Sequence, residues 1–202
     1  MAGNNSAEIR VAGTGKLYIG AVGATPPVFG AAEPSDTDWG TGWTNLGFTT
    51  GDGVTFSKKD KLEPIDSWQS VSPVHYIYSA RDLSLKFSLL QFNEDTLKLF
   101  MGGGKVEADG TPADSYKYEI SERPFADVRA LGLEFTDAKA GATGNVAVTY
   151  RFIIPRGQVT ATDDIKLARK AASTLGITFT AMSNGAGQPL ATFHMKDSSY
   201  AA

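Results

Sequence analysis

The stretch Asp82–Gln91, DLSLKFSLLQ, carries an apolar residue at every second position from Leu83 to Leu89. Ser84, Lys86 and Ser88 occupy the positions between them. Successive side chains of a β-strand point to opposite faces, so this alternation predicts a strand with one face buried and one face polar.

The same alternation recurs on both sides of this stretch. Asn145–Pro155, NVAVTYRFIIP, places Val146, Val148, Tyr150, Phe152 and Ile154 on one face, with Thr149 and Arg151 opposite. Leu175–Ala181 repeats it with Leu175, Ile177 and Phe179. Shorter candidate strands are Lys16–Ala21, Tyr116–Ile120, Ala130–Phe135 and Gln158–Thr162. The chain is therefore predicted to be mainly β.

One α-helix is predicted at about residues 93–101. Asn93 is a favourable N-cap, Glu94 and Asp95 complement the helix dipole, and Gly102 supplies a stop. The segment Asp164–Ala172 has helical composition but connects two strand patterns, so two interpretations remain open: a short helix, or a strand that continues from Gln158 into a charged turn.

Length and composition fit one globular domain. The chain has 202 residues, of which 42% are hydrophobic and 20% charged, with a net charge of −3. This charge gives no basic surface for sequence-independent nucleic-acid binding. Cysteine is absent, which excludes disulfides, thiolate nucleophiles and cysteine-ligated zinc. The first residues lack the apolar core of a signal peptide, and no apolar run approaches the ~20 residues that span a bilayer.

Motifs for catalysis do not emerge from the sequence. Asp163 and Asp164 are adjacent, so on a strand they would face opposite ways rather than form an acid–base pair. The GDG at 51–53 lacks the Lys-Ser/Thr continuation of a phosphate-binding loop. His75 and His194 are too isolated to predict a metal site. We therefore expect no enzymatic activity and no cofactor.

The stretch 58–74, KKDKLEPIDSWQSVSPV, combines a loop-like composition with the large apolar Trp68. A tryptophan in such a segment either folds back onto its own domain or contacts a partner, because it brings a large apolar area at low entropic cost. The residues alone leave both interpretations open.

Taken in order, several segments resemble the major tail proteins, or tail tube proteins, of long non-contractile-tailed phages, with the pattern closest to phages of actinobacteria. The segments are GKLYIGAVGATPP (15–27), WTNLGFTTGDGVTFS (43–57), IDSWQSV (65–71), SLKFSLLQFNEDTLKLFMGGG (84–104) and YRFIIPRGQVTATDDIKLARKAASTLGITFTAM (150–182). The resemblance covers most of residues 13–182. Each segment alone is unspecific, but their order and spacing are characteristic.

The resemblance implies a tail-tube fold, which is a β-sandwich or barrel with one flanking helix. It implies a single domain over 1–202, with an N-terminal arm at 1–14, a long inter-ring loop at 58–74 and a C-terminal arm at 183–202. Six such subunits close into a ring, and the rings stack into the tube that carries DNA into the host. Partners implied are further copies of the chain and the tape-measure, tail-tip and tail-terminator proteins, without membrane binding. The implied location is the virion tail, after assembly in the host cytoplasm.

Within this framework, the predicted inter-subunit contact residues lie in the 58–74 segment: Leu62, Pro64, Ile65, Trp68 and Val71. The charged residues around them, Lys58, Lys59, Asp60, Lys61, Glu63 and Asp66, are expected to form ion pairs at the rim of that contact. Because DNA should pass without specific binding, the lumen is expected to be neutral or acidic. Lys86 and Glu134 are candidate lumen residues of opposite sign.

Two other functions remain open. A related tube subunit, from a contractile tail or a secretion system, would share the fold. A monomeric β-sandwich binding module would instead use exposed aromatic residues, with Trp39, Trp68 and Tyr76 as a sugar-binding platform.

Overall fold

The computed structural model describes residue 4 and residues 8–29, 39–141 and 144–200. These residues contain ten strands, one α-helix and a short 3-10 helix, η2 (Ser198–Tyr200). The strands are β1 (Thr14–Gly20), β2 (Trp43–Asn45), β3 (Thr49–Ser67), β4 (Ser70–Leu89), β5 (Val106–Ala108), β6 (Tyr116–Tyr118), β7 (Arg129–Gly141), β8 (Gly144–Thr162), β9 (Leu175–Ala181) and β10 (Thr192–Lys196), and the helix is α1 (Glu94–Phe100).

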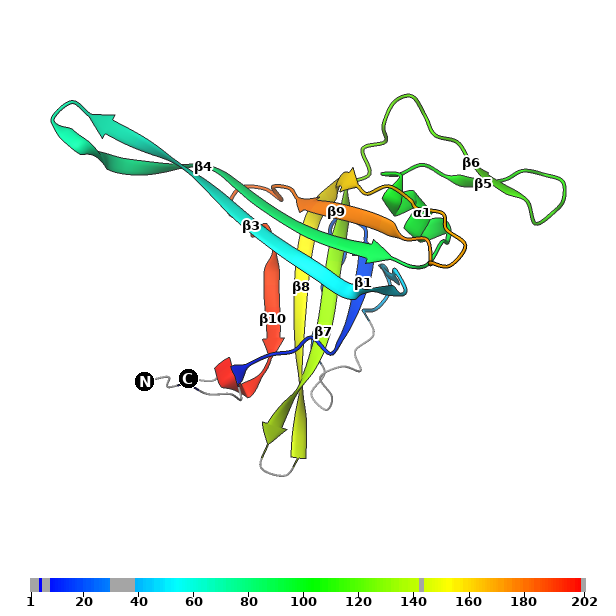
Figure 1. The fold of residues 1–202 in the computed structure, drawn as a ribbon, viewed down its shortest axis with the longest axis horizontal. Helices are drawn as coiled ribbons and strands as arrows, with labels where there is room; N and C mark the ends of the chain where they lie inside the picture. Colours follow the sequence, from blue (N-terminus) through cyan, green and yellow to red (C-terminus); the bar gives the residue numbers. More distant parts are fainter. Residues whose placement is uncertain (1–3, 5–7, 30–38, 142–143, 201–202) are drawn as a thin grey trace.

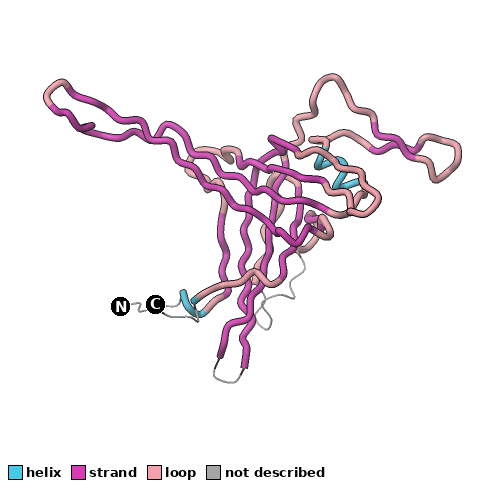
Figure 2. The backbone as a smooth tube through the Cα atoms, viewed as in Figure 1, coloured by secondary structure: helices cyan, strands magenta, loops and turns pink. Residues whose placement is uncertain are grey.

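Eight of these strands form one antiparallel sheet in the order β2-β1-β7-β8-β9-β4-β3, with β10 also paired to β8. The long β8 pairs with β10 around Phe152 and with β9 from Gly157 onward. It therefore joins one half of the sheet, which contains β2, β1, β7 and β10, to the other half, which contains β9, β4 and β3. The halves fold over one another, and Phe56 of β3 packs edge-on against Phe152 with their ring centroids 5.0 Å apart. The prediction of a mainly β sandwich is confirmed (Figures 1 and 2).

The main core consists of the apolar strand faces that the alternation predicts. Its fully buried members include Leu85 and Leu89 of β4, Phe152 and Ile154 of β8, and Phe179 of β9. Gly157 of β8 leaves room for the Phe179 ring of the neighbouring strand β9, because a Cβ there would lie 2.5 Å from Phe179 Cε1.

A second core covers the opposite face of β1, β7 and β8. Trp39 is 4% exposed, stacks on Tyr18 at 4.3 Å between centroids and contacts the Trp43 ring edge-on at 5.0 Å. Its indole lies directly over Gly132, where a Cβ would be 2.1 Å from Trp39 Cζ3. Arg151 and Thr149, expected to face solvent opposite the apolar stripe of β8, are buried instead. Both faces of β8 are therefore buried in this region.

The helix agrees with its prediction to within a residue at each end. The Asn93 side chain accepts a hydrogen bond from the Thr96 backbone N–H at 2.9 Å, and the Asn93 N–H donates to Thr96 Oγ1 at 2.9 Å. Gly102 follows the C-cap with φ of +76°. In 164–172, by contrast, the described chain contains only a turn closed by a bridge between Ala168 and Ala171, so the charged-turn alternative holds.

Two segments differ from their predictions. Residues 58–74 are not a loop: they form the outer part of a hairpin in which β3 pairs with β4 and only Trp68 and Gln69 turn. Each strand supplies the hydrogen-bonding partner of the other, and Pro64 is tolerated because β3 is an edge strand with one free side. The predicted C-terminal arm at 183–202 contains β10, because TFHMK alternates in β fashion and finds the exposed edge of β8.

We expect Gly132→Ala to destabilise the fold by about 1–3 kcal/mol, because its methyl group would overlap the Trp39 indole. Urea unfolding of the variant measures this loss. Gly15→Ala is the matched control, since a Cβ at this neighbouring strand position meets no atom closer than 3.7 Å. Equal stability of the two variants would contradict the assigned packing of Trp39.

Candidate assembly site

The β3–β4 hairpin extends far beyond the sandwich (Figure 1, upper left). Its inner part is anchored in the core by the alternating residues of β4 from Leu83 to Leu89. In its outer part every β4 residue from Ser70 to Asp82 is exposed. The pairing nevertheless continues to Ser67 and Ser70, so the exposed part is a defined two-stranded ribbon.

The outer hairpin carries many exposed apolar residues. Leu62 lies opposite Tyr78 and Pro64 opposite Tyr76, so these four share one face of the ribbon. The exposed large apolar residues of the outer hairpin are Leu62, Ile65, Trp68, Val71, Val74, Tyr76, Ile77 and Tyr78. Apolar side chains thus populate both faces, which is the signature of a surface that contacts another molecule.

The tip is the most exposed part of the hairpin. Trp68 is 99% exposed and Val71 is 108% exposed relative to an extended reference chain. Of the two interpretations of Trp68, the structure excludes the one in which it folds back onto its own domain. All five predicted contact residues lie on the outer hairpin, but whether they contact another subunit stays a prediction.

Sequence reasoning missed the β4 half of this surface, from Val74 to Tyr78. The signal was present in the run Val74–Tyr78, VHYIY, whose β-branched and aromatic composition favours a strand with two apolar faces. Only Tyr76 was considered, as part of a sugar platform. That platform does not form, because Trp39 is buried in the second core.

The charged residues of the hairpin pair largely with one another. Arg81 Nε and Lys58 Nζ each lie 2.7 Å from an Asp60 carboxylate oxygen. The hydrogen bond from Arg81, followed by the one from Lys58, lowers the pKa of Asp60 to about 2. Lys61 pairs with Glu63 at 2.9 Å. The expected rim charges are therefore mostly satisfied within the subunit.

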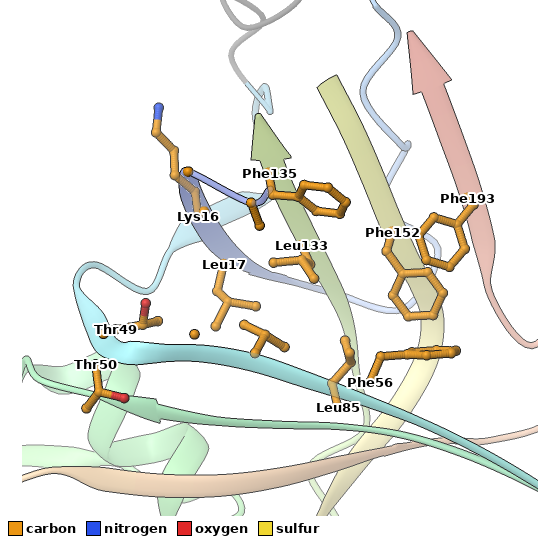
Figure 3. A pocket seen from close by; sticks show the side chains of 16 residues that line it. Lys16, Leu17, Thr49, Thr50, Phe56, Leu85, Leu133, Phe135, Phe152 and Phe193 are labelled. Carbon is orange, nitrogen blue, oxygen red and sulfur yellow. The ribbon is translucent and has the colours of Figure 1, made fainter. Parts of the chain in front are cut away.

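An open apolar cavity of about 360 Å³ lies at the base of the same hairpin. Figure 3 shows it between β3, β1, β7, β8 and β10. Aromatic side chains dominate its walls: Phe56, Phe135, Phe152 and Phe193. Lys16 is the one charged residue among the described residues that line it, but its side chain points away from the cavity, on the face that it shares with Glu134.

A polar cluster fastens the two ends of the chain to the sheet. Asp197, just after β10, accepts hydrogen bonds from Arg10 Nε at 2.9 Å and from the Tyr150 hydroxyl at 2.7 Å. Burial alone would raise the pKa of Asp197, but bonds from the Ser199 backbone, Tyr150 and Arg10 outweigh it and hold this pKa well below its ordinary value. Burial, together with the bond to Asp197, raises the pKa of Tyr150 to about 12. Arg10 and Asp197 are thus held against Tyr150 of β8 in the single subunit.

The two candidate lumen residues lie in different environments. Glu134 is buried and accepts a hydrogen bond from Arg151 Nε at 2.6 Å, so it faces the second core and cannot line a lumen. Lys86 is exposed and lies 3.0 Å from the Asp163 carboxylate. Of the two candidates, only Lys86 lies on the surface of the subunit, where its ammonium group pairs with the Asp163 carboxylate.

Other kinds of site are scarce in the part of the chain that the structure describes. No group of three or more potential ligands is placed to hold a metal ion there. None of its helices is long and apolar enough to cross a membrane. The prominent surfaces of the described residues are therefore the hairpin and the cavity.

Comparison with known proteins identifies the family of the chain. No curated protein matches the chain. The family model described as phage tail tube protein matches residues 1–202. The chain belongs to the phage tail tube protein family. Its role is accordingly structural, as a component of the virion tail that self-assembles into a tube.

We expect Asp197→Asn to destabilise this tail tube protein at pH 7 and to flatten its pH dependence in acid. The lowered pKa of Asp197 stabilises the fold above the unfolded-state pKa of about 3.9, and this contribution falls as the pH drops further. Urea unfolding at pH 7, 5 and 3 measures both effects. Asp114→Asn, at an exposed position, is the control. If the free energy of unfolding of Asp197→Asn changed with pH as steeply as that of the unmodified protein, the stabilising role of the Arg10–Tyr150–Asp197 cluster would be contradicted.

Proposed function

We propose that this tail tube protein closes into six-membered rings, and that these rings stack through the β3–β4 hairpin into the conduit for DNA ejection. The observation that carries this proposal is the exposed apolar outer hairpin, from Leu62 to Tyr78. A two-stranded ribbon is at best marginally stable alone in water, and one with apolar side chains on both faces gains most from a neighbour on each side.

The open edges of the sheet support ring closure. Within the described chain, β3 pairs on one side only, with β4, which leaves a long row of backbone groups along its outer edge. At the other end of the order lies the short β2, which covers only part of β1. Exposed edges favour aggregation, and a closed head-to-tail ring removes them. Lateral pairing between copies would build one continuous barrel around a lumen.

The size of the Trp68 side chain explains why the tip should dominate stacking. Full burial of an aromatic side chain removes about 150–250 Å² from water. At about 25 cal/mol per Å² this gives about 4–6 kcal/mol before the costs of association are subtracted. Six hairpins per ring would multiply this contribution.

The remaining parts of the proposal follow from the tube. The rings would grow on a tail-tip complex around a tape-measure protein and end at a terminator protein, in the host cytoplasm. DNA would pass without specific binding, which a net charge of −3 per subunit favours. No catalysis and no cofactor are needed for this role. A tube subunit of a contractile tail or a secretion system is the competing proposal, and co-purification with a sheath protein would favour it.

We expect Trp68→Ala to abolish or shorten tubes while leaving the single subunit folded. Because Trp68 is fully exposed, its removal should change the free energy of unfolding by less than about 0.5 kcal/mol. A loss of 1.4 kcal/mol or more per contact would raise the protein concentration needed for assembly at least about tenfold. Negative-stain electron microscopy and sedimentation over a concentration series measure assembly.

The matched control for this test is Ile120→Ala, which truncates another exposed apolar residue far from the hairpin. It should assemble like the unmodified protein. Normal tubes from Trp68→Ala would show that the hairpin tip is not the anchor. If the unmodified protein forms neither rings nor tubes, even with a tail-tip initiator, the ring proposal fails.

A further inference from the structure

The hairpin tip and the apolar cavity lie at the two ends of the exposed length of β3. Phe56 lines the cavity and Trp68 follows the last residue of the strand. Because this stretch is a paired strand with a rise of about 3.3 Å per residue, Trp68 lies about 40 Å along the hairpin from Phe56. The tip of a subunit therefore cannot enter its own cavity while the hairpin stays paired.

Translation of a second copy along the hairpin brings these two features together. If the copy is displaced by the length of the outer hairpin, its cavity arrives where the first copy's tip ends. The contact uses two different surfaces of the same chain, so it is heterologous and repeats without limit along one direction. An open stack is the arrangement that such a contact produces.

Size and polarity also match. An apolar cavity of about 150 Å³ suffices to bind benzene. The present cavity of about 360 Å³ therefore has room for the larger indole of Trp68 and part of a neighbouring side chain such as Val71. Its aromatic walls offer edge and face contacts to an indole.

We propose that the cavity lined by Phe56, Phe135, Phe152 and Phe193 is the receptor for the Trp68 tip of a second copy of this chain. This inference rests on the proposed ring stacking and adds the acceptor surface to it. Each subunit would be a donor at one end of β3 and an acceptor at the other.

Site-directed cross-linking tests this pairing directly, because the chain has no cysteine of its own. The test variant carries Gln69→Cys beside the tip tryptophan and Thr49→Cys in the cavity lining, opposite the buried Leu89. The control variant carries Gln69→Cys and Lys105→Cys, the latter exposed and outside the cavity lining. Trp68 is retained in both. Assembled tubes are oxidised mildly or treated with a short thiol-to-thiol reagent, and then separated on non-reducing denaturing gels.

We expect a ladder of covalent multimers from the test variant and at most dimers from the control. A disulfide requires Cα atoms about 4.4–6.8 Å apart, so a ladder places tip and cavity lining in contact. Tubes without a ladder from the test variant, or with a ladder only from the control, would overturn this inference while leaving the ring stacking intact. Failure of the unmodified protein to assemble would overturn the proposed function, and this inference with it.

Discussion

Strand pairing that continues past the last buried side chain is the constraint on which this structure depends. β3 and β4 pair in the core, where Leu85 and Phe87 are buried, and the same ladder carries on to Ser67 and Ser70. The core fixes the direction of the ribbon at its base, and backbone hydrogen bonds carry that direction to the tip. A loop of the same composition would present Trp68 in many places, at a high entropic cost of docking.

The second core packs on the opposite face of β7 and β8, two of the strands that bound the cavity at the hairpin base. Burial of the Arg151–Glu134 pair, beneath Trp39 and over the face of β7 and β8, is costly for two charged groups unless they are paired as closely as they are here. The pair and the indole link β7 to β8 on the face that points away from the layer carrying β3. The cavity at the hairpin base is bounded by these same strands, so its shape depends on their rigidity.

The sequence predicted what depends on alternation and capping. The faces containing Leu85, Phe152 and Ile177 are buried as expected, and α1 begins at the predicted N-cap, Asn93. The outer hairpin was interpreted as a loop because a ribbon without a core beneath it shows no alternation of polar and apolar residues. Its strands are held by each other, and such pairing is not visible in a single segment. Burial of Glu134 escaped prediction for a related reason, since its partner Arg151 lies on another strand.

Ion pairing on the hairpin has a consequence for the unassembled subunit. A long, exposed edge strand with apolar residues is a hazard, and natural edges are protected by charges. Lys58, Asp60 and Arg81 form such a charged band between the core and the apolar tip. Because Lys58 and Arg81 are exposed and all three groups are already paired within the ribbon, they contribute little to stability but keep the edge hydrated. The large exposed apolar side chains of the hairpin thus lie beyond this charged band, at the tip and on the outer faces.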